Sequence, residues 1–354
     1  MAHSLDLVYS TAKGFASLKP LFSYMQSAGW DVRLNKVHRL CLQNRKMIQT
    51  ISSTIVIAYD KPLVRLEKCG WQGKFIYIEH GLSPMKYYTY RYDFFQRASL
   101  LFYPGEIFKR KMEAINPKFD RGLLGGYPKI DELVSLSIDR QALCKSFNLA
   151  PDKPIILFAP SWGGKRNPNA GIHNAKYLKD MENVIIVPHS ADYPLVKQYN
   201  AIKPGAGGIS QFLHLADVVV SDVSSVLAEA SILNKPVVQL ILPHYPGCFP
   251  DKEKRKNGTW ISDEMLTREM ATDRQSRPFK IPYVDEDWIM GHTALPEDLK
   301  AAIEDALAHP EKHAKQRQYW AEQSCWGADG QSSQRLTEMI GHFLETGEVK
   351  QVEV

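Results

Sequence analysis

Short, almost continuous runs of Val, Ile, Leu and Phe recur along this chain, and they constrain its fold more than any other feature. A half-exposed strand alternates apolar and polar residues, whereas a strand buried on both faces of a parallel sheet is apolar throughout. The runs predict strands at residues 5–9, 31–34, 54–58, 74–78, 100–103, 154–159, 183–187, 217–220 and 236–241, with a further strand ending at Gly125. Helical spacing predicts helices at 15–29, 106–115, 224–233, 297–307 and 333–344.

The alternation of strand and helix restarts after a polar connector at residues 150–154. At about 150 residues per domain, the chain length also favours two domains. We therefore predict an α/β protein with two Rossmann-like domains, over residues 1–140 and 141–325, joined near 135–152. A C-terminal helix over 326–354 is expected to pack back near the domain interface. In such folds ligands bind at the carboxyl ends of the strands, which here means the cleft between the domains.

Composition excludes several classes of protein. The 354 residues carry a net charge of +5 and 44% hydrophobic residues, which argues against a disordered chain or a dedicated nucleic-acid binder. The densest basic stretch, residues 251–256, is diluted by acids and favours a solvated loop over a lipid contact. Five widely spaced cysteines without a CxxC pair predict free thiols in a reducing compartment.

Nothing at the start of the chain resembles a signal peptide, and the longest apolar runs fall well short of the ~18 residues that a membrane span needs. We therefore expect a cytoplasmic protein whose membrane contact is peripheral, on the inner face of the cytoplasmic membrane.

The segment that points most specifically to a function is the turn from residue 221 to 225, which joins a buried strand directly to a helix. Ser221, Asp222, Ser224 and Ser225 supply hydroxyls and backbone N–H groups at the helix start, which suits a phosphate or nucleotide. The alternative is that these residues only cap the helix. Glu229, one turn further along, is placed to bind a ribose diol. Its alternative is a solvated helical glutamate.

Two histidines follow strands of different domains. His80 precedes Gly81, which allows close approach, and His189 follows Val187-Pro188. A strand-end histidine is well placed for proton transfer or for donating to a phosphate, although a lone histidine is more often structural. The segment after the strand at 154–159 adds Pro160, Ser161, Lys165 and Arg166 as pyrophosphate contacts, with a basic surface turn as the alternative.

Gly126 and Asp131 are supporting residues in a glycine-containing segment that can also be a simple turn. The familiar hydrolase, metalloprotease, Walker and GxGxxG motifs are missing from the sequence, so we expect neither a metal nor a cofactor.

The ordered set of motifs resembles the CDP-glycerol glycerophosphotransferase family, the TagF-like teichoic-acid and capsule polymerases. The resemblance spans about residues 75–340. Its motifs are Glu79-His80-Gly81, Gly126-Tyr-Pro-Lys-Ile-Asp131, Leu157-Phe-Ala-Pro-Ser-Trp162, Val187-Pro-His189, Ser221-Asp-Val-Ser-Ser225 with Leu233-Asn-Lys-Pro236, and Asp329-Gly-Gln-Ser-Ser-Gln-Arg335.

The resemblance implies a GT-B fold and transfer of glycerol phosphate, or a related polyol phosphate, from CDP-glycerol to a hydroxyl of a cell-surface polysaccharide or lipid-linked glycan, with release of CMP. The first domain then takes the acceptor and the second the nucleotide donor. His80 matches the proposed general base and His189 the second histidine, near the donor phosphates. The 221–225 turn matches the phosphate cradle, and Glu229 matches the acidic position at the ribose.

Two departures stand out. Pro84 comes one residue later than the proline that usually follows the HG pair, and Gly163-Gly164 displaces the basic residue after the APxW-like segment to Lys165 or Arg166. We also expect this protein to lack the long N-terminal domain that the polymerases use for membrane attachment, so it could be a single-transfer enzyme, a capsule enzyme or one half of a larger machine. The alternatives are a GT-B glycosyltransferase that uses a UDP-, GDP- or CMP-linked sugar in capsule or lipopolysaccharide synthesis, more weakly a UDP-sugar 2-epimerase, and a non-catalytic nucleotide-binding subunit.

Overall fold

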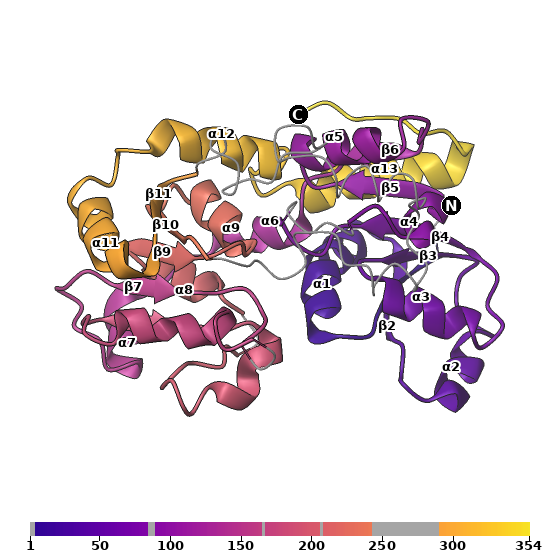
Figure 1. The fold of residues 1–354 in the computed structure, drawn as a ribbon. Coiled ribbons are helices and arrows are strands. Elements are labelled where there is room, and N and C mark those ends of the chain that lie inside the picture. The colour runs from indigo at the N-terminus through magenta and orange to yellow at the C-terminus, as the bar shows by residue number, and fades with distance from the viewer. Residues whose placement is uncertain (1–3, 84–88, 165–166, 206–207, 243–289) are drawn as a thin grey trace, which may run out of the picture.

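The structure is a computed structural model that describes residues 4–83, 89–164, 167–205, 208–242 and 290–354. Figure 1 shows two α/β halves side by side, each built on its own parallel sheet. The predicted fold class is therefore confirmed. Lys165, Arg166 and the basic stretch at 251–256 lie outside the described residues.

The first half contains a sheet of six parallel strands in the order β2-β1-β3-β4-β5-β6. Their bounds are β1 (Ser4–Tyr9), β2 (Asp31–Lys36), β3 (Thr54–Ile57), β4 (Lys74–Ile78), β5 (Leu100–Tyr103) and β6 (Gly122–Leu124). Leu7 pairs with Leu34 on one side and with Val56 on the other. Because the strands run parallel, their carboxyl ends lie along one edge of the sheet, the edge that carries the candidate site.

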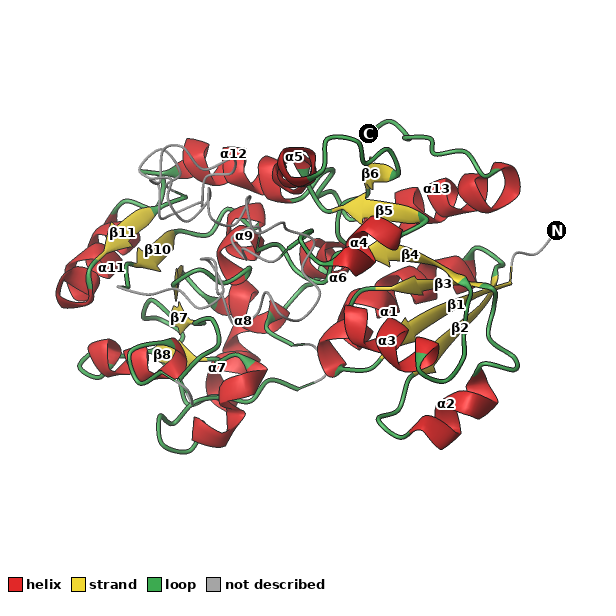
Figure 2. Ribbon diagram, turned by 45° about the vertical axis from the view of Figure 1, so that its right-hand side comes forward, coloured by secondary structure: helices red, strands yellow, loops and turns green. Residues whose placement is uncertain are grey.

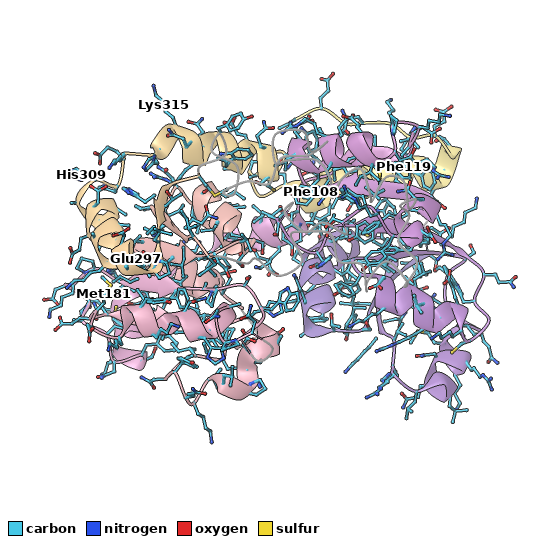
Figure 3. All side chains as sticks on the ribbon, in the orientation of Figure 1. Phe108, Phe119, Met181, Glu297, His309 and Lys315 are labelled. Carbon is cyan, nitrogen blue, oxygen red and sulfur yellow. The ribbon has the colours of Figure 1, made fainter. Side chains whose placement is uncertain are left out.

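Helices cover both faces of this sheet. On one face, α1 (Ala12–Ser27) and α13 (Ser332–Thr346) pack together, and Leu18 and Leu336 share a core cluster with Leu5. The other face carries the shorter helices, which are α2 (Cys41–Met47), α3 (Asp60–Glu67), α4 (Asp93–Arg97) and α5 (Glu106–Ile115). Phe108 of α5, labelled in Figure 3, is fully buried in this second core.

The second half contains five parallel strands in the order β11-β10-β9-β7-β8. Their bounds are β7 (Ile156–Phe158), β8 (Val184–Ile186), β9 (Val218–Ser221), β10 (Val237–Leu240) and β11 (His292–Ala294). The described helices that follow β7 in this half are η1 (Gly171–Leu178), η2 (Ser190–Leu195), α8 (Ser210–Leu215), α9 (Val226–Ile232), η5 (Pro296–Asp298) and α11 (Leu299–Ala308), where η marks a 3₁₀ helix. In Figure 2 the two sheets stand apart, with α9 and α6 (Pro128–Ser135) between them.

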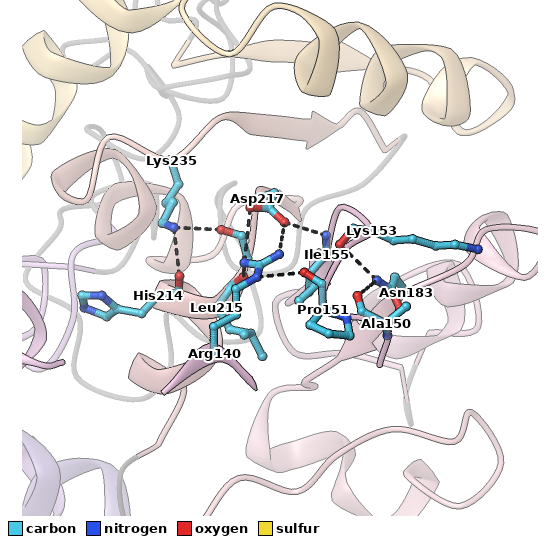
Figure 4. A network of polar contacts seen from close by, with 11 residues as sticks. Arg140, Ala150, Pro151, Lys153, Ile155, Asn183, His214, Leu215, Asp217 and Lys235 are labelled. Atoms are coloured by element: carbon cyan, nitrogen blue, oxygen red, sulfur yellow. Dashed lines mark hydrogen bonds and ion pairs between the residues drawn. The ribbon is translucent and has the colours of Figure 1, made fainter. Parts of the chain in front are cut away.

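A network of hydrogen bonds and ion pairs holds the connection between the halves in place (Figure 4). It includes α7 (Arg140–Ser146), a helix that the sequence pattern did not predict. Arg140 donates to the Asp217 carboxylate at 2.7 Å, and the same carboxylate accepts from the Ile155 N–H at 2.8 Å. The Asn183 side chain donates to the Ala150 carbonyl at 2.8 Å. The end of the connector is therefore anchored to the second sheet.

The chain returns to the first half through α12 (Ala314–Ser324) and α13. Helix α12 contacts both α9 and α5, so it bridges the two halves, and α13 lies on α1. The sequence pattern predicted neither α12 nor β11. Helix α12 has too few apolar residues for a clear helical stripe, and β11 has no Val/Ile run because it is a three-residue strand, His-Thr-Ala. Among the described helices, none combines the length and apolar character needed to cross a membrane.

Candidate active site

A cavity of about 360 Å³ lies between the two halves. Residues from the carboxyl ends of strands in both sheets line it, among them His80 after β4 and His189 after β8. The lining residues are Thr11, Lys13, Tyr59, Glu79, His80, Gly81, Ser83, Thr89, Ser161, Trp162, His189, Ser190, Ala191, Val223, Ser224 and Ser225. The two predicted histidines are thus brought to one site.

The imidazole of His80 is held by the carboxylate beside it. His80 Nδ1 lies 2.9 Å from Glu79 Oε1, which also accepts from the His80 backbone N–H at 3.0 Å and from the Tyr77 hydroxyl at 3.1 Å. In the neutral imidazole this partner places the proton on Nδ1 and leaves the Nε2 lone pair as an acceptor. The geometry therefore leaves Nε2 of His80 able to accept a proton, with the side chain one-quarter exposed.

The Glu79 carboxyl group, just after the end of β4, remains ionised although it is buried. Burial on its own would raise the pKa of Glu79, but the charge of His80 and the hydrogen bonds from His80 and Tyr77 outweigh it, so the pKa lies below its ordinary value. Burial and the nearby Glu79 carboxylate hold the pKa of Tyr77 well above its usual range. The lowered pKa of Glu79 and the raised pKa of Tyr77 favour an ionised carboxylate and a neutral phenol beside His80.

His189 has the opposite arrangement. Its Nδ1 accepts a hydrogen bond from the Ala191 N–H at 3.1 Å, because His189 caps the 3₁₀ helix η2. The neutral ring must then carry its proton on Nε2. His189 is consequently arranged as a hydrogen-bond donor, the role that a phosphate requires.

The residues of the 221–225 turn fall into two groups. Some hold neighbouring loops together, and the others line the cavity. Asp222 is buried, and its carboxylate accepts from the Ser161 N–H at 2.8 Å, the Ser161 hydroxyl at 2.6 Å and the Val223 N–H at 2.7 Å. Ser221 is buried and donates to the Ala159 carbonyl at 2.6 Å. These two residues lock the loops after β7 and β9 together, so of the predicted cradle only Ser224 and Ser225 line the cavity, beside Ser161.

Glu229 is not among the described residues that line the cavity. Its carboxylate is almost fully buried, and both of its oxygens accept from Lys129 Nζ at 3.0 Å. Lys129 belongs to α6 and Glu229 to α9, so the pair joins the two halves. The structure therefore places Glu229 at the interface between the halves, in an ion pair with Lys129, and not in solvent.

Three other predicted residues, Asp131, Gly126 and Pro160, belong to the protein framework and are not among the residues that line the cavity. Asp131 accepts from the backbone N–H groups of Ser332 and Ser333 at 2.9 and 2.7 Å and so caps α13. Gly126 has φ +69, and a Cβ there would lie 2.5 Å from Ser332 Oγ. Pro160 is buried and does not line the cavity. Within the described part of the chain, no group of three or more His, Cys, Asp or Glu side chains is placed to hold a metal ion.

The sequence reasoning missed several cavity residues that follow strands of the first sheet. Thr11 and Lys13 follow β1, and Tyr59 follows β3. The rule that singled out His80, which looks just beyond the carboxyl end of a buried strand, applies equally to them. A Cβ on Gly81 would lie 3.6 Å from Lys13 Nζ and 3.7 Å from Ser225 Oγ, so groups from both halves meet at this glycine.

Comparison with solved structures identifies the architecture. The wall teichoic acid polymerase TagF is 17% identical with a TM-score of 0.62, over 97% of this chain and 89% of that one. The UDP co-structure of S. aureus MnaA has a TM-score of 0.59 at 12% identity over 99% and 100% of the two chains. An enzyme named as a UDP-N-acetylglucosamine 2-epimerase of Listeria monocytogenes has 0.59 at 15% over the full length of both. No curated protein matches the chain.

The two Rossmann-like halves, with a cavity between them that strand-end histidines line, have the GT-B fold. Residues 77–242 match the model of the CDP-Glycerol:Poly(glycerophosphate) glycerophosphotransferase family. The matched segment is just under half of the chain and holds both cavity histidines and the 221–225 turn. The resemblance seen in the motifs is thereby confirmed: residues 77–242 of this chain are similar to the CDP-glycerol glycerophosphotransferase family.

Proposed function

We propose that this enzyme transfers glycerol phosphate, or a related polyol phosphate, from a CDP-activated donor to a hydroxyl of a cell-surface polysaccharide or lipid-linked glycan, and releases CMP. The observation that carries the proposal is the pair of histidines with complementary hydrogen bonding. His80 offers an acceptor nitrogen and His189 a donor nitrogen in one cavity. Both lie in the segment that matches the family.

The acceptor hydroxyl gives its proton to His80 Nε2 as its oxygen attacks the β-phosphorus of the donor. A new P–O bond forms to the acceptor, and the bond from the β-phosphorus to the bridging oxygen breaks. CMP leaves with that oxygen and its electron pair. A positioned base contributes about 10²–10⁴-fold to such a step. Glu79 stabilises the imidazolium that forms, because its carboxylate touches Nδ1.

Negative charge grows on the leaving CMP during this step. We assign its stabilisation to the Nε2–H of His189, the hydroxyls of Ser224 and Ser225, and the ammonium group of Lys13. Hydrogen-bond donors that are already in place stabilise a transition state without reorganisation. The CDP-activated donor is a substrate, and the proposal includes no cofactor and no nucleic-acid partner.

The family match supports CDP-glycerol as the donor, and a structure of the similar TagF was determined after a soak with CDPG. The biological role that follows is teichoic-acid or capsule polysaccharide synthesis at the cell envelope. We propose that the enzyme meets its glycan or lipid-linked acceptor in the cytoplasm, on the inner face of the membrane, through peripheral contact.

A donor panel tests the proposal. The enzyme is incubated with CDP-glycerol, CDP-ribitol, UDP-N-acetylglucosamine, a GDP-sugar and a CMP-sugar, each with and without glycan acceptors, and the released nucleotide is identified. CMP from CDP-glycerol or CDP-ribitol, in an acceptor-dependent reaction, is the expected result. Release of UDP, GDP or CMP from a nucleotide sugar points instead to a glycosyltransferase, epimerised UDP-sugar to an epimerase, and tight binding of CDP without turnover to a binding subunit.

A further inference from the structure

We propose that helix α2 and the residues just before it form a docking surface for an anionic lipid membrane. The α2 patch consists of Lys36, Arg39, Leu40, Leu42, Arg45 and Lys46. The inference gives the proposed peripheral contact a position in the fold, and it is tested by binding, so its outcome is separate from that of the donor assay. In Figures 1 and 2, α2 lies at the lower edge of the first half.

The two leucines are unusually exposed. Leu40 is 72% exposed and Leu42 71%, and among the large apolar side chains of the described residues only Val354, at the chain terminus, has comparable exposure. Two neighbouring leucines held in water cost free energy unless another surface covers them. They therefore mark a contact site.

The exposed leucines are held by helix α2, which is anchored to the rest of the protein. Asn44 is 1% exposed, and its side chain accepts from the His38 N–H and donates to the His38 carbonyl, each at 2.9 Å. Val37 is buried, and Met47 and Ile48 pack against the core. The leucines are thus presented by a fixed segment whose opposite side is already in contact with the protein.

The charged residues on either side of the two leucines in the sequence are all basic. Residues 32–59 contain five Lys or Arg and no Asp or Glu. Arg33 is paired with Asp6, but the other four, all in the α2 patch, are exposed. Apolar side chains flanked by bases suit the boundary between anionic headgroups and acyl chains. A protein interface is richer in aromatic residues, and the α2 patch contains none.

The position suits delivery of a lipid-linked acceptor. The edge strand β2 leads into the α2 patch from the same edge of the sheet at which β1 leads into Thr11 and Lys13 of the cavity. Docking through α2 therefore places the first half, to which the proposed function assigns the acceptor, at the lipid surface.

The test is co-sedimentation of the full-length protein with vesicles of phosphatidylcholine, alone or mixed with phosphatidylglycerol, at low and high salt. We expect binding that needs phosphatidylglycerol and weakens as salt rises. Arg45→Gln with Lys46→Gln should lower the partition coefficient roughly 25-fold, about fivefold per charge. Leu40→Ser with Leu42→Ser should lower it about tenfold for each leucine. The matched control on another helix, Lys315→Gln with Tyr319→Ser, replaces an exposed base and a half-exposed aromatic residue and should bind like the wild type.

Three results would overturn the proposal. They are a wild-type protein that ignores phosphatidylglycerol vesicles, α2 variants that bind as well as the control, and a concentration-dependent dimer in light scattering that the leucine variants abolish. The last would assign the α2 patch to a second copy of the chain. CMP release in solution by the α2 variants should equal that of the wild type, which separates this test from the one for the transfer reaction.

Discussion

At the scale of single residues, the site rests on two histidines that differ in what holds their Nδ1 atoms. A carboxylate faces His80 Nδ1, and a backbone N–H faces His189 Nδ1. The first arrangement leaves Nε2 of the neutral His80 ring as an acceptor, and the second leaves Nε2 of the neutral His189 ring as a donor. A phosphoryl transfer needs one of each, since a proton must leave the nucleophile while charge is stabilised on the leaving group.

Replacing Glu79 by Gln tests the first arrangement. The amide keeps the size of the side chain but loses the charge that stabilises the His80 imidazolium, so kcat should fall on the order of 10- to 10³-fold with KM little changed. Steady-state kinetics of CMP release measure this. The control is Tyr77→Phe, which removes one donor to Oε1 but not the charge, and it should cost only a few-fold. A kcat equal to that of the wild type in Glu79→Gln would exclude the role.

The second arrangement is tested by comparing His189→Gln with His189→Asn. The Gln amide can reach the position of Nε2 and still donate, whereas the Asn amide reaches only the position of Nδ1. We expect kcat to fall about 10²-fold or more for Asn and markedly less for Gln, as for the loss of one charge-stabilising donor. Equal losses in the two variants would mean that donation from Nε2 is not what matters.

At the scale of elements, the cavity depends on contacts that fix one half against the other. The Lys129–Glu229 pair joins α6 to α9, and Ser83 Oγ donates to the Val223 carbonyl at 3.2 Å. Several residues of the family motifs likewise hold one element against another. Gly126 and Asp131 hold the returning C-terminal helix, which in turn covers α1.

Glu229→Ala distinguishes the domain link from a ribose site. Removing the carboxylate leaves the Lys129 ammonium largely buried without its partner, and we expect a loss of roughly 2–4 kcal/mol in the free energy of unfolding, somewhat reduced because Lys129 is one-fifth exposed. Denaturant unfolding measures it, and the double variant Lys129→Met/Glu229→Met should recover part of the loss. Unchanged stability with a raised KM for CDP-glycerol would instead support the ribose role.

The sequence alone predicts the strands of this fold well and its polar contacts poorly. Buried runs such as 74–78 and 100–103 coincide with β4 and β5 because the hydrophobic pattern is local. The strand-end rule locates His80 and His189 for the same reason. The partner of Glu229 is 100 residues away, and the cap of α13 is about 200 residues away. Contacts at such separations follow from the packing of whole elements, which no local pattern records.

At the scale of the whole molecule, one histidine pair links stability to pH. His292 of β11 is 8% exposed, and its ring lies 4.6 Å from that of His313. Burial and the charges of His313, Lys312 and Arg317 lower the pKa of His292, against the opposing Asp305 carboxylate. Burial likewise lowers the pKa of His313. Both rings are therefore neutral in the folded protein at pH values where the unfolded chain takes up protons.

The unfolded state binds more protons below the ordinary histidine pKa of about 6.5, so stability should fall as the pH falls from about 7.5 to about 5.5. Thermal unfolding across this range measures the slope. His292→Leu should flatten it, whereas His309→Gln, which alters an exposed histidine beside the same Asp305, should not. An unchanged slope in His292→Leu would place the pH dependence elsewhere.

We propose that the molecule as a whole holds a CDP-activated donor between its domains and uses His80 to activate the acceptor. The most direct measurement is His80→Ala, with CDP-glycerol binding followed by calorimetry and CMP release followed in single-turnover reactions. We predict that binding stays within a few-fold of the wild type while the transfer rate falls by about 10²–10⁴. Transfer at the wild-type rate, or a loss of binding as large as the loss of rate, would contradict the account.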